Sequence, residues 1–368
     1  MGETKRKKKG SPRQARQGKW REATAGAFAG AVSRVVISPL DVIKIRFQIQ
    51  REATSSSARA AASGKYRGVA QALSCIVREE GVVGLWRGTV PGLLLTVPYT
   101  AVQFFALETF KSAVQARRKT QDRTSESMRE RNRDLFDRER MLSFVGGACA
   151  GVAATTASYP FDLLRTTMAA QGVPRQYPTM IHAARGIVAQ RDLFRGMYAG
   201  LGATIVEIIP YAALQFGLYD VFTTLYQRKF ERSAHSSSSP RPLSPSKDAS
   251  PPSSALDWTY LVSKPFVCGL ASGFIAKFAT HPLDVVKKRY QVAGLRRSKT
   301  YGRGFGVSEV AVLGIARLLM ATVREEGIKG IYKGVTPSLI KSAPSAAITF
   351  CVYSLILDQI KKMEAENS

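Results

Sequence analysis

One six-residue pattern, Pro-x-Asp-x-x-Lys/Arg, occurs three times in the chain, at residues 39–44, 160–165 and 282–287. A second block follows each copy: an acid begins it, an aromatic residue stands six positions later, and a glycine closes it. These blocks lie at residues 80–88, 192–200 and 326–334. The first motif recurs at spacings of 121 and 122 residues, and the second block follows each copy. This recurrence indicates three copies of one structural unit.

The repeats define the organisation of the 368 residues. We expect them at residues 22–113, 141–229 and 258–363. The remainder consists of a basic tail at 1–21, a charged linker at 114–140 and a Ser/Pro-rich linker at 230–257. The last composition is typical of a flexible tether, with proline-directed phosphorylation of its Ser-Pro steps as the alternative. The tail has neither an apolar core nor an amphipathic pattern, so we expect no secretory signal and no cleaved transit peptide.

Each repeat contains two long apolar segments. The first segments cover residues 23–50, 143–171 and 263–291, and the second cover 89–111, 201–227 and 335–361. About 20 helical residues cross a bilayer, so each segment is long enough to span one. A short amphipathic piece, such as residues 66–78, separates the two. The sequence therefore predicts an all-α membrane protein with six transmembrane helices in three pseudo-threefold repeats and short helices between them.

Charged residues follow one face of each first segment. On the first helix this face carries Arg34, Asp41, Lys44 and Gln48, at spacings of 7, 3 and 4. The other two helices repeat it with Thr155, Asp162 and Arg165, and with Lys277, Asp284, Lys287 and Gln291. Such a stripe cannot face lipid, so it faces a partner helix or a water-filled cavity. Three such stripes in a threefold repeat imply six helices around a central polar path. The alternative is three local ion pairs on helix surfaces.

A proline precedes the acid in each motif, and proline kinks a helix. The kinks are expected at Pro39, Pro160 and Pro282. Three kinked helix ends can meet on the axis, where three acids and three bases can close a ring of ion pairs. Such a ring is a removable plug, which alternating access requires.

These motifs resemble the signature of the mitochondrial carrier family over residues 20–362. The resemblance implies a multi-pass protein of the mitochondrial inner membrane with both termini toward the cytosol. It implies a matrix gate formed by Asp41, Lys44, Asp162, Arg165, Asp284 and Lys287. It also implies glutamine braces at Gln48 and Gln291, whereas Ala169 occupies that position in the second repeat.

The family also has a cytosolic gate on its even helices, and this chain matches that pattern poorly. Its gate residues reduce to Glu108, Lys111 and Asp220, since other positions of the motif lack the aromatic or the charge. At most one full ion pair can form. We therefore expect a weaker cytosolic than matrix gate, and a smaller effect on transport from neutralising Lys111 than from neutralising Lys287.

The even helices carry a second polar stripe where the family contacts its substrates. Its first members are Leu95, Glu207 and Lys341, followed by Tyr99, Tyr211 and Ser345, and then by Gln103, Gln215 and Thr349, with Thr96 adjacent. Arg34 and Lys277 add two cations from the odd helices, so three cations oppose Glu207. This arrangement favours a polyanion with a cationic end, and thiamine pyrophosphate fits that description. The alternative is that Glu207 only neutralises one of these cations.

In addition, the repeats of this chain resemble those of the fungal thiamine pyrophosphate carriers within this family. The resemblance implies uptake into the matrix in exchange for nucleotides, by a monomer in contact with membrane lipid such as cardiolipin. A carrier of another phosphorylated nucleotide or of coenzyme A is the alternative within the class.

Other classes fit less well. The net charge of +27 would suit a nucleic-acid-binding protein, but the basic tail lacks the aromatic residues that stack on bases. Attraction to anionic lipid explains a charge located in tails and loops. With four scattered cysteines, three histidines and no nucleophile–base pair, we expect no catalytic site, no metal and no cofactor.

Overall fold

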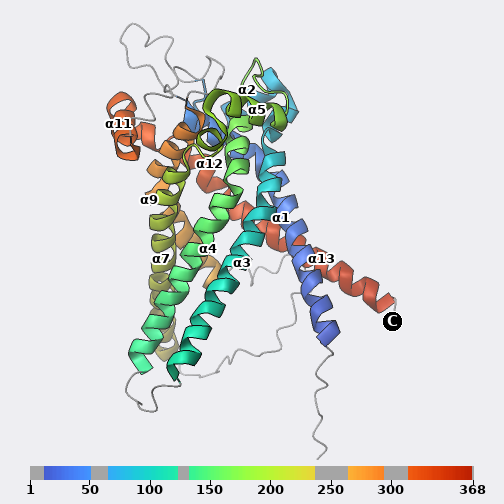
Figure 1. Ribbon diagram of the computed structural model, residues 1–368, viewed down its shortest axis with the longest axis vertical. Coiled ribbons are helices and arrows are strands. Elements are labelled where there is room, and N and C mark those ends of the chain that lie inside the picture. The colour runs from blue at the N-terminus through green and yellow to red at the C-terminus, as the bar shows by residue number, and fades with distance from the viewer. Residues whose placement is uncertain (1–11, 51–64, 123–131, 237–263, 294–313, 367–368) are drawn as a thin grey trace, which may run out of the picture. The chain divides into compact units, whose positions relative to one another are not determined.

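The computed structural model describes residues 12–50, 65–122, 132–236, 264–293 and 314–366 (Figure 1). All regular elements in these ranges are helices, which agrees with the predicted all-α fold. The first repeat has α1 (Pro12–Ile49), α2 (Val69–Glu80), η2 (Val82–Trp86) and α3 (Thr89–Asp122). The second has α4 (Asn132–Ala169), α5 (Met180–Arg191), α6 (Leu193–Met197) and α7 (Leu201–Ser236). The third has α9 (Lys264–Val292), α11 (Ile315–Ile331), α12 (Val335–Ile340) and α13 (Ser342–Glu366).

Two compact units divide the chain. The first unit combines Met1–Ile37, Leu218–Ser272 and Ile340–Ser368, and the second combines Ser38–Gly217 with Gly273–Leu339. Several long helices contribute to both units. The three Pro-x-Asp-x-x-Lys/Arg motifs all lie in the second unit, so their mutual geometry is defined there.

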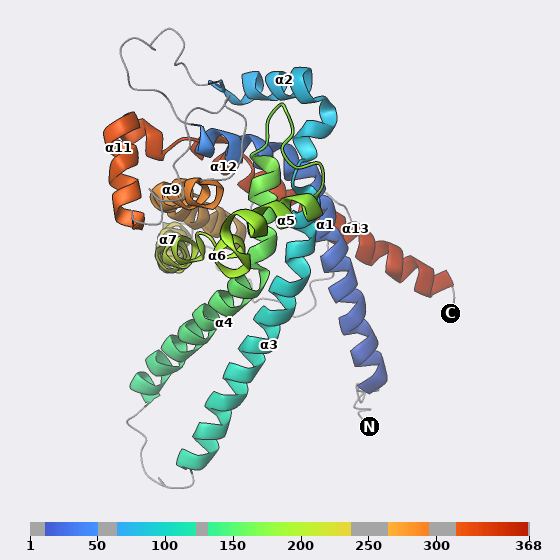
Figure 2. The ribbon, with the colours of Figure 1, turned by 45° about the horizontal axis from the view of Figure 1, so that its top comes forward.

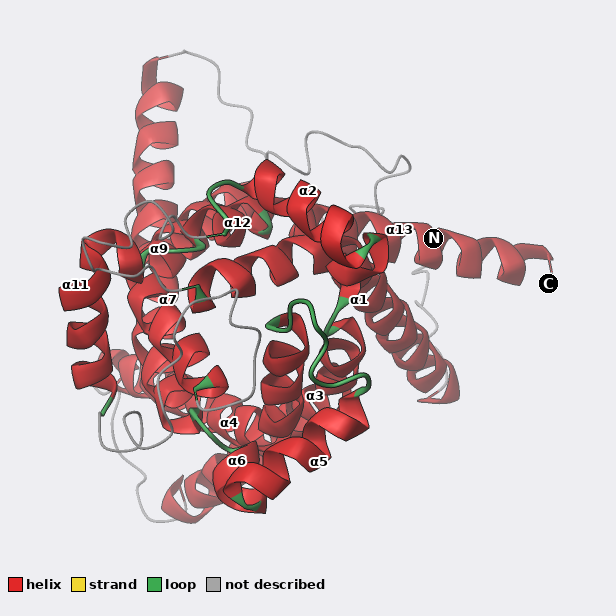
Figure 3. Cartoon of the chain, turned by 90° about the horizontal axis from the view of Figure 1, so that it is seen from above, coloured by secondary structure: helices red, strands yellow, loops and turns green. Residues whose placement is uncertain are grey.

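In the second unit α3 and α4 run side by side, and the short helices α2, α5 and α11 lie at one common end (Figures 1 and 2). Figure 3 views that end directly. Each short helix packs against a long one. Ile76 of α2 joins the apolar cluster of α1, Ile187 of α5 joins that of α4, and Leu318 of α11 joins that of α9. One core cluster per repeat therefore fixes the ends of the three motif helices.

Hydropathy alone identifies three spans in the described residues. They are Ala25–Ile49, Val82–Val114 and Leu201–Tyr226. The helices α4 and α9 have the length to cross a membrane, at 38 and 29 residues, but carry more charge. Polar side chains that face a partner helix lower the average hydropathy without exposing charge to lipid.

The sixth predicted helix is interrupted. A continuous helix over residues 335–361 was expected, but α12 ends at Ile340 and α13 begins at Ser342. Pro344 follows closely and has no N–H to donate to the Ile340 carbonyl, which weakens the helix at this point. Lys341, a predicted substrate contact, therefore lies at the interruption.

The glycines that close the second blocks need their lack of a side chain. Gly88 and Gly334 have φ of 89° and 79°, a region that other residues rarely adopt. A Cβ atom on Gly88 would lie 2.6 Å from the Arg165 carbonyl oxygen, and one on Gly334 would lie 3.0 Å from that of Lys44. Each glycine thus allows a close approach between one repeat and the motif helix of another.

The second repeat is out of register by one residue in this block. The sequence pattern pairs Asp192 with the acid Glu80, but Asp192 has φ of 68°, like Gly81 at 73° and Gly327 at 70°. All three residues directly follow or interrupt the short helix. Asp192 therefore occupies the glycine position, and Arg191 stands where the other repeats have Glu80 and Glu326. One extra residue before the closing Gly200 accounts for the shift, and the segment that contains it forms the short helix α6.

Candidate functional site

Three ion pairs join the motif helices in a closed ring. Arg165 of α4 pairs with Asp41 of α1. The Lys44 Nζ of α1 lies 2.7 Å from the Asp284 Oδ2 of α9, and the Lys287 Nζ of α9 lies 3.5 Å from the Asp162 Oδ2 of α4. Each base therefore reaches the acid of another repeat, which is the arrangement that kinked helices with a shared inner face were expected to allow.

Both predicted glutamine braces contact an acid of the ring. The Gln48 side chain donates to Asp284 Oδ2 at 3.2 Å, and the Gln291 side chain donates to Asp162 Oδ2 at 3.0 Å. Gln291 also donates to the Tyr159 hydroxyl at 3.2 Å and accepts from Thr166 at 2.9 Å. Gln48 Oε1, in contrast, is buried without a hydrogen-bond partner. The two braces are therefore equivalent in position but unequal in bonding.

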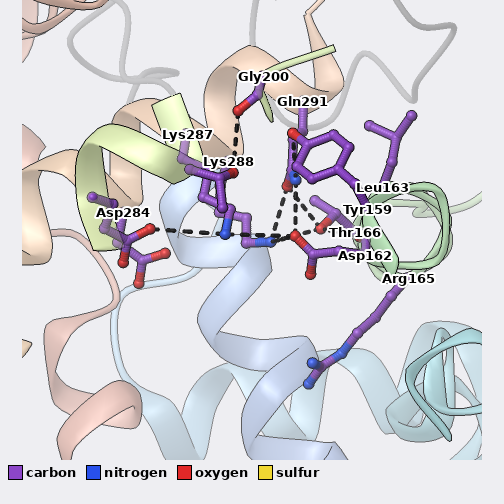
Figure 4. A network of polar contacts seen from close by, with 12 residues as sticks. Tyr159, Asp162, Leu163, Arg165, Thr166, Gly200, Asp284, Lys287, Lys288 and Gln291 are labelled. Carbon is purple, nitrogen blue, oxygen red and sulfur yellow. Dashed lines mark hydrogen bonds and ion pairs between the residues drawn. The ribbon is translucent and has the colours of Figure 1, made fainter. Parts of the chain in front are cut away.

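A fourth base, Lys288, lies in this network and was not predicted. The Lys288 Nζ lies 3.5 Å from Asp162 Oδ2, and it donates to Thr166 Oγ1 at 2.8 Å and to Gln291 Oε1 at 2.9 Å. Figure 4 shows Lys287 and Lys288 both directed toward Asp162. The sequence does show a second lysine after the motif, but a neighbouring residue on an ideal helix points about 100° away, so the pattern alone did not place it at the ring.

A buried arginine links α1 to the end of α4. Arg46 binds Glu80 through both guanidinium nitrogens, at 2.5 and 2.8 Å, and both side chains are fully buried. The same guanidinium donates to the backbone carbonyls of Ala169 at 3.1 Å and Gln171 at 2.7 Å. Arg87 provides a second partner for Glu80. We call this set of contacts the arginine clamp of the α1/α4 joint.

The α9/α1 joint has the equivalent clamp. Arg289 binds Glu326 at 2.8 and 2.9 Å, and it donates to the Gln48 carbonyl at 3.0 Å and to the Gln50 carbonyl at 3.3 Å. Lys333 takes the part of Arg87, at 2.6 Å from Glu326. Neither clamp was predicted from the sequence, although an arginine two residues beyond the motif base in two repeats is a visible signal.

The α4/α9 joint has no such clamp among the described residues. Thr167 takes the place of Arg46 and Arg289, and its hydroxyl donates to the Leu163 carbonyl of its own helix at 2.9 Å. Arg191 takes the place of the glutamate. Both partners of the clamp are thus changed together, and Lys288 and Gln291 connect this joint instead.

Two predicted substrate contacts pair with one another beside the ring. The Lys277 Nζ lies 3.0 Å from Glu207 Oε1 and 2.9 Å from Asp284 Oδ2. The Lys287 Nζ lies 3.8 Å from Glu207 Oε2. The carboxylate of Glu207 is therefore neutralised by lysines in this structure, as the alternative interpretation of this residue predicts. The sequence did not reveal that Glu207 also approaches a base of the ring.

Other predicted contacts lie in different surroundings. Thr96, Gln103 and Gln215 are partly exposed in the second unit. Arg34 and Lys341 belong to the first unit, where Ser33 of α1 donates to the Ser345 carbonyl of α13 at 3.0 Å.

The predicted cytosolic-gate residues fall in both units. Asp220 lies in the first unit, and Glu108 and Lys111 lie in the second, where Glu108 is exposed. The side chain of Lys111 lies outside the described residues, so the described contacts concern the ring and its neighbourhood.

The environment of Cys75 on α2 does not activate its thiol. The Cys75 thiol donates to Glu79 at 3.2 Å. Burial, this hydrogen bond and the charge of Glu79 raise the pKa of the thiol above its usual value. The thiol is thus the form present at neutral pH, and it is a weaker nucleophile than the thiolate.

Comparison with known proteins agrees with this architecture. The family model described as mitochondrial carrier protein matches residues 16–118, 137–230 and 259–364. The chain belongs to the mitochondrial carrier family. The apolar helices fit a multi-pass protein of the mitochondrial inner membrane, as predicted.

Three curated relatives illustrate the similarity. Mitochondrial thiamine diphosphate carrier 1 of Arabidopsis thaliana is 44% identical over 92% of this chain and 93% of its own. Mitochondrial thiamine pyrophosphate carrier 1 of Neurospora crassa is 36% identical over 90% of this chain and 89% of its own. The mitochondrial thiamine pyrophosphate carrier of Bos taurus is 34% identical over 94% of each. Similarity to proteins so named thus extends from plants to fungi and animals.

Proposed function

We propose that this chain transports thiamine pyrophosphate, also called thiamine diphosphate, across the mitochondrial inner membrane into the matrix. The observation that carries the proposal is its similarity, over nearly the whole chain, to carriers named for this substrate. Family membership supports transport as the activity, and the proposal assigns no catalytic step and no cofactor.

The chemistry of the site supports this substrate class. Arg34, Lys277 and Lys341 are the proposed contacts for the diphosphate, and Glu207 is the proposed contact for the cationic end. Thiamine diphosphate carries a permanent positive charge on its thiazolium ring and negative charges on its phosphates. A site with several cations and one carboxylate can bind both ends by charge-assisted hydrogen bonds. Further polar contacts are proposed from Thr96, Gln103 and Gln215.

The ring of ion pairs supports transport by alternating access. Closed, it joins all three motif helices, and a solute can leave toward the matrix only when its pairs separate. We assign it as the matrix gate and Glu108, Lys111 and Asp220 as a weaker cytosolic gate. Exchange for a nucleotide, a monomeric carrier and contact with cardiolipin complete the proposal.

Reconstituted vesicles test the assignment. Liposomes loaded with thiamine pyrophosphate should take up the labelled compound, and unlabelled thiamine pyrophosphate should compete better than a nucleotide or coenzyme A. Glu207→Gln and Lys341→Ala should each abolish uptake while the protein keeps a cooperative thermal transition. Preference for a nucleotide or for coenzyme A would replace the proposed substrate, and unchanged uptake by either variant would remove that residue from the site.

A further inference from the structure

The Glu207 carboxylate lies between two lysines of α9. Its Oε1 accepts from Lys277 at 3.0 Å, and its Oε2 lies 3.8 Å from the Lys287 Nζ. Glu207 is buried, so its charge needs these partners. A carboxylate and a phosphate present similar anionic oxygens to an ammonium group. The side chain of Glu207 therefore places anionic oxygens between two ammonium groups, an arrangement that a phosphate group could also form.

We propose that Lys277 and Lys287 form a cradle for the diphosphate, which Glu207 fills while the carrier is empty. The inference deepens the proposed function and rests on it for the identity of the ligand. It gives Lys287 two roles, as a base of the ring and as a ligand contact. The substrate and the gate then compete for one ammonium group.

The surrounding charges allow both lysines to turn toward a ligand. When Lys287 turns away, Asp162 Oδ2 keeps two partners, the Lys288 Nζ at 3.5 Å and the Gln291 Nε2 at 3.0 Å. Without Lys277, Asp284 keeps Lys44 at 2.7 Å. Neither carboxylate is left buried and uncompensated, which would be costly.

The charge count of this region explains why each carboxylate keeps a partner when one lysine turns away. Five cations surround four carboxylates among the described residues of the second unit. The cations are Lys44, Arg165, Lys277, Lys287 and Lys288, and the carboxylates are Asp41, Asp162, Glu207 and Asp284. Lys288 is the additional cation, because the equivalent positions in the other repeats are Ile45 and Thr166.

Displacement of Glu207 requires a new partner for its charge. A ligand that supplies a cation meets this need, and Tyr211 lies one helical turn further along α7. The Lys277 Nζ lies 5.8 Å from the centroid of the Tyr211 ring, so this aromatic face already receives a cation. A thiazolium ring can take that place when Lys277 turns to the diphosphate. Both ends of the ligand then replace an interaction present in the empty carrier.

Binding of two probes to the purified full-length carrier in detergent tests the cradle by calorimetry. Glu207→Gln removes the internal competitor, so inorganic pyrophosphate should bind roughly tenfold more tightly than to wild type. The same variant should bind thiamine diphosphate more weakly, because the thiazolium loses its counter-ion. Opposite changes for the two probes are not expected from general damage to the fold. Weaker or unchanged pyrophosphate binding by Glu207→Gln overturns the proposal.

Lys287 is tested with a matched control. Lys287→Met should weaken pyrophosphate binding roughly tenfold, whereas Lys287→Arg should retain it within about threefold and thus report an intact site. Lys329→Met removes an exposed lysine of α11 in the same unit and should leave binding within about twofold. Equal binding by Lys287→Met and Lys329→Met contradicts the cradle.

The results also separate the cradle from the proposed substrate. If the pyrophosphate changes occur as expected but wild type does not exchange thiamine diphosphate in vesicles, the cradle stands and the substrate assignment falls. If thiamine diphosphate is exchanged but Glu207→Gln does not tighten pyrophosphate binding, the substrate assignment stands and the cradle falls.

Discussion

The α1/α4 and α4/α9 joints occupy equivalent positions in a threefold arrangement, yet different interactions connect them. At the first, Arg46 binds a buried glutamate and two backbone carbonyls. At the second, a lysine and a glutamine reach a carboxylate and a hydroxyl. The guanidinium has a fixed planar geometry with several donors, whereas an ammonium on a flexible chain can change partners. Repeats that share one motif thus differ in how firmly neighbouring repeats are joined.

Removal of a clamp should have the largest effect on stability. Arg46→Met removes the Arg46 hydrogen bonds to the Ala169 and Gln171 carbonyls and leaves Glu80 with only part of its compensation, at a cost of about 3–5 kcal/mol. Lys288→Met at the other joint should cost less, because Lys287 remains near Asp162. Thermal unfolding in detergent, compared between the two variants, checks the difference. An equal or larger loss for Lys288→Met would show that the unclamped joint is not the weaker one.

The second-largest loss of stability is expected from a side chain added to Gly88, which closely approaches the clamped α1/α4 joint. Gly88→Ala forces a side chain into a positive φ and against the Arg165 carbonyl, at roughly 1–3 kcal/mol. Gly68→Ala is the control, since a Cβ there meets no atom within 4 Å and φ is −152°. The melting midpoint should fall for Gly88→Ala only. A similar fall for both would mean that the contact across the joint is unimportant.

Substitution of the two glutamine braces should cause the smallest losses of stability, and their ratio is the most selective comparison. Gln291→Ala removes contacts to Asp162, Tyr159, Thr166 and Lys288 and should cost about 1–2 kcal/mol. Gln48→Ala removes one bond to Asp284 together with a buried, unpartnered oxygen, and should cost less than half of that. Chemical or thermal unfolding of both variants measures the ratio. A greater loss for Gln48→Ala would contradict the unequal bonding of the braces.

Much of this architecture could be predicted from residue spacing. The proline, the acid and the base of each motif recur at fixed positions, so the three inner faces and their charges were evident before the structure. Lys288 was not, because adjacency in sequence does not tell whether a neighbour on a helix reaches the same network. The register of Asp192 was also missed, since an acid at the expected distance from an aromatic residue concealed one extra residue in the turn.

The partners of Glu207 illustrate another limit of sequence. Its isolation among cations was visible, but pairing depends on which lysines reach the same depth on α9. Lys277 and Lys287 are ten residues apart and still approach the same carboxylate. Pro282 lies between them inside α9, and the bend that a proline is expected to cause in a helix changes which side chains converge.

Two clamps among three helix ends have a mechanical consequence. Three members linked at every contact form a closed hoop, which can widen only if all of its links stretch together. Three members clamped at two contacts and joined by more adaptable bonds at the third have one weaker seam, along which the end members can separate while both clamps stay intact. In this molecule α1 is the middle member, held to α4 by Arg46 and to α9 by Arg289. We therefore expect the proposed matrix gate to part along the seam between α4 and α9, where no arginine clamp is found among the described residues.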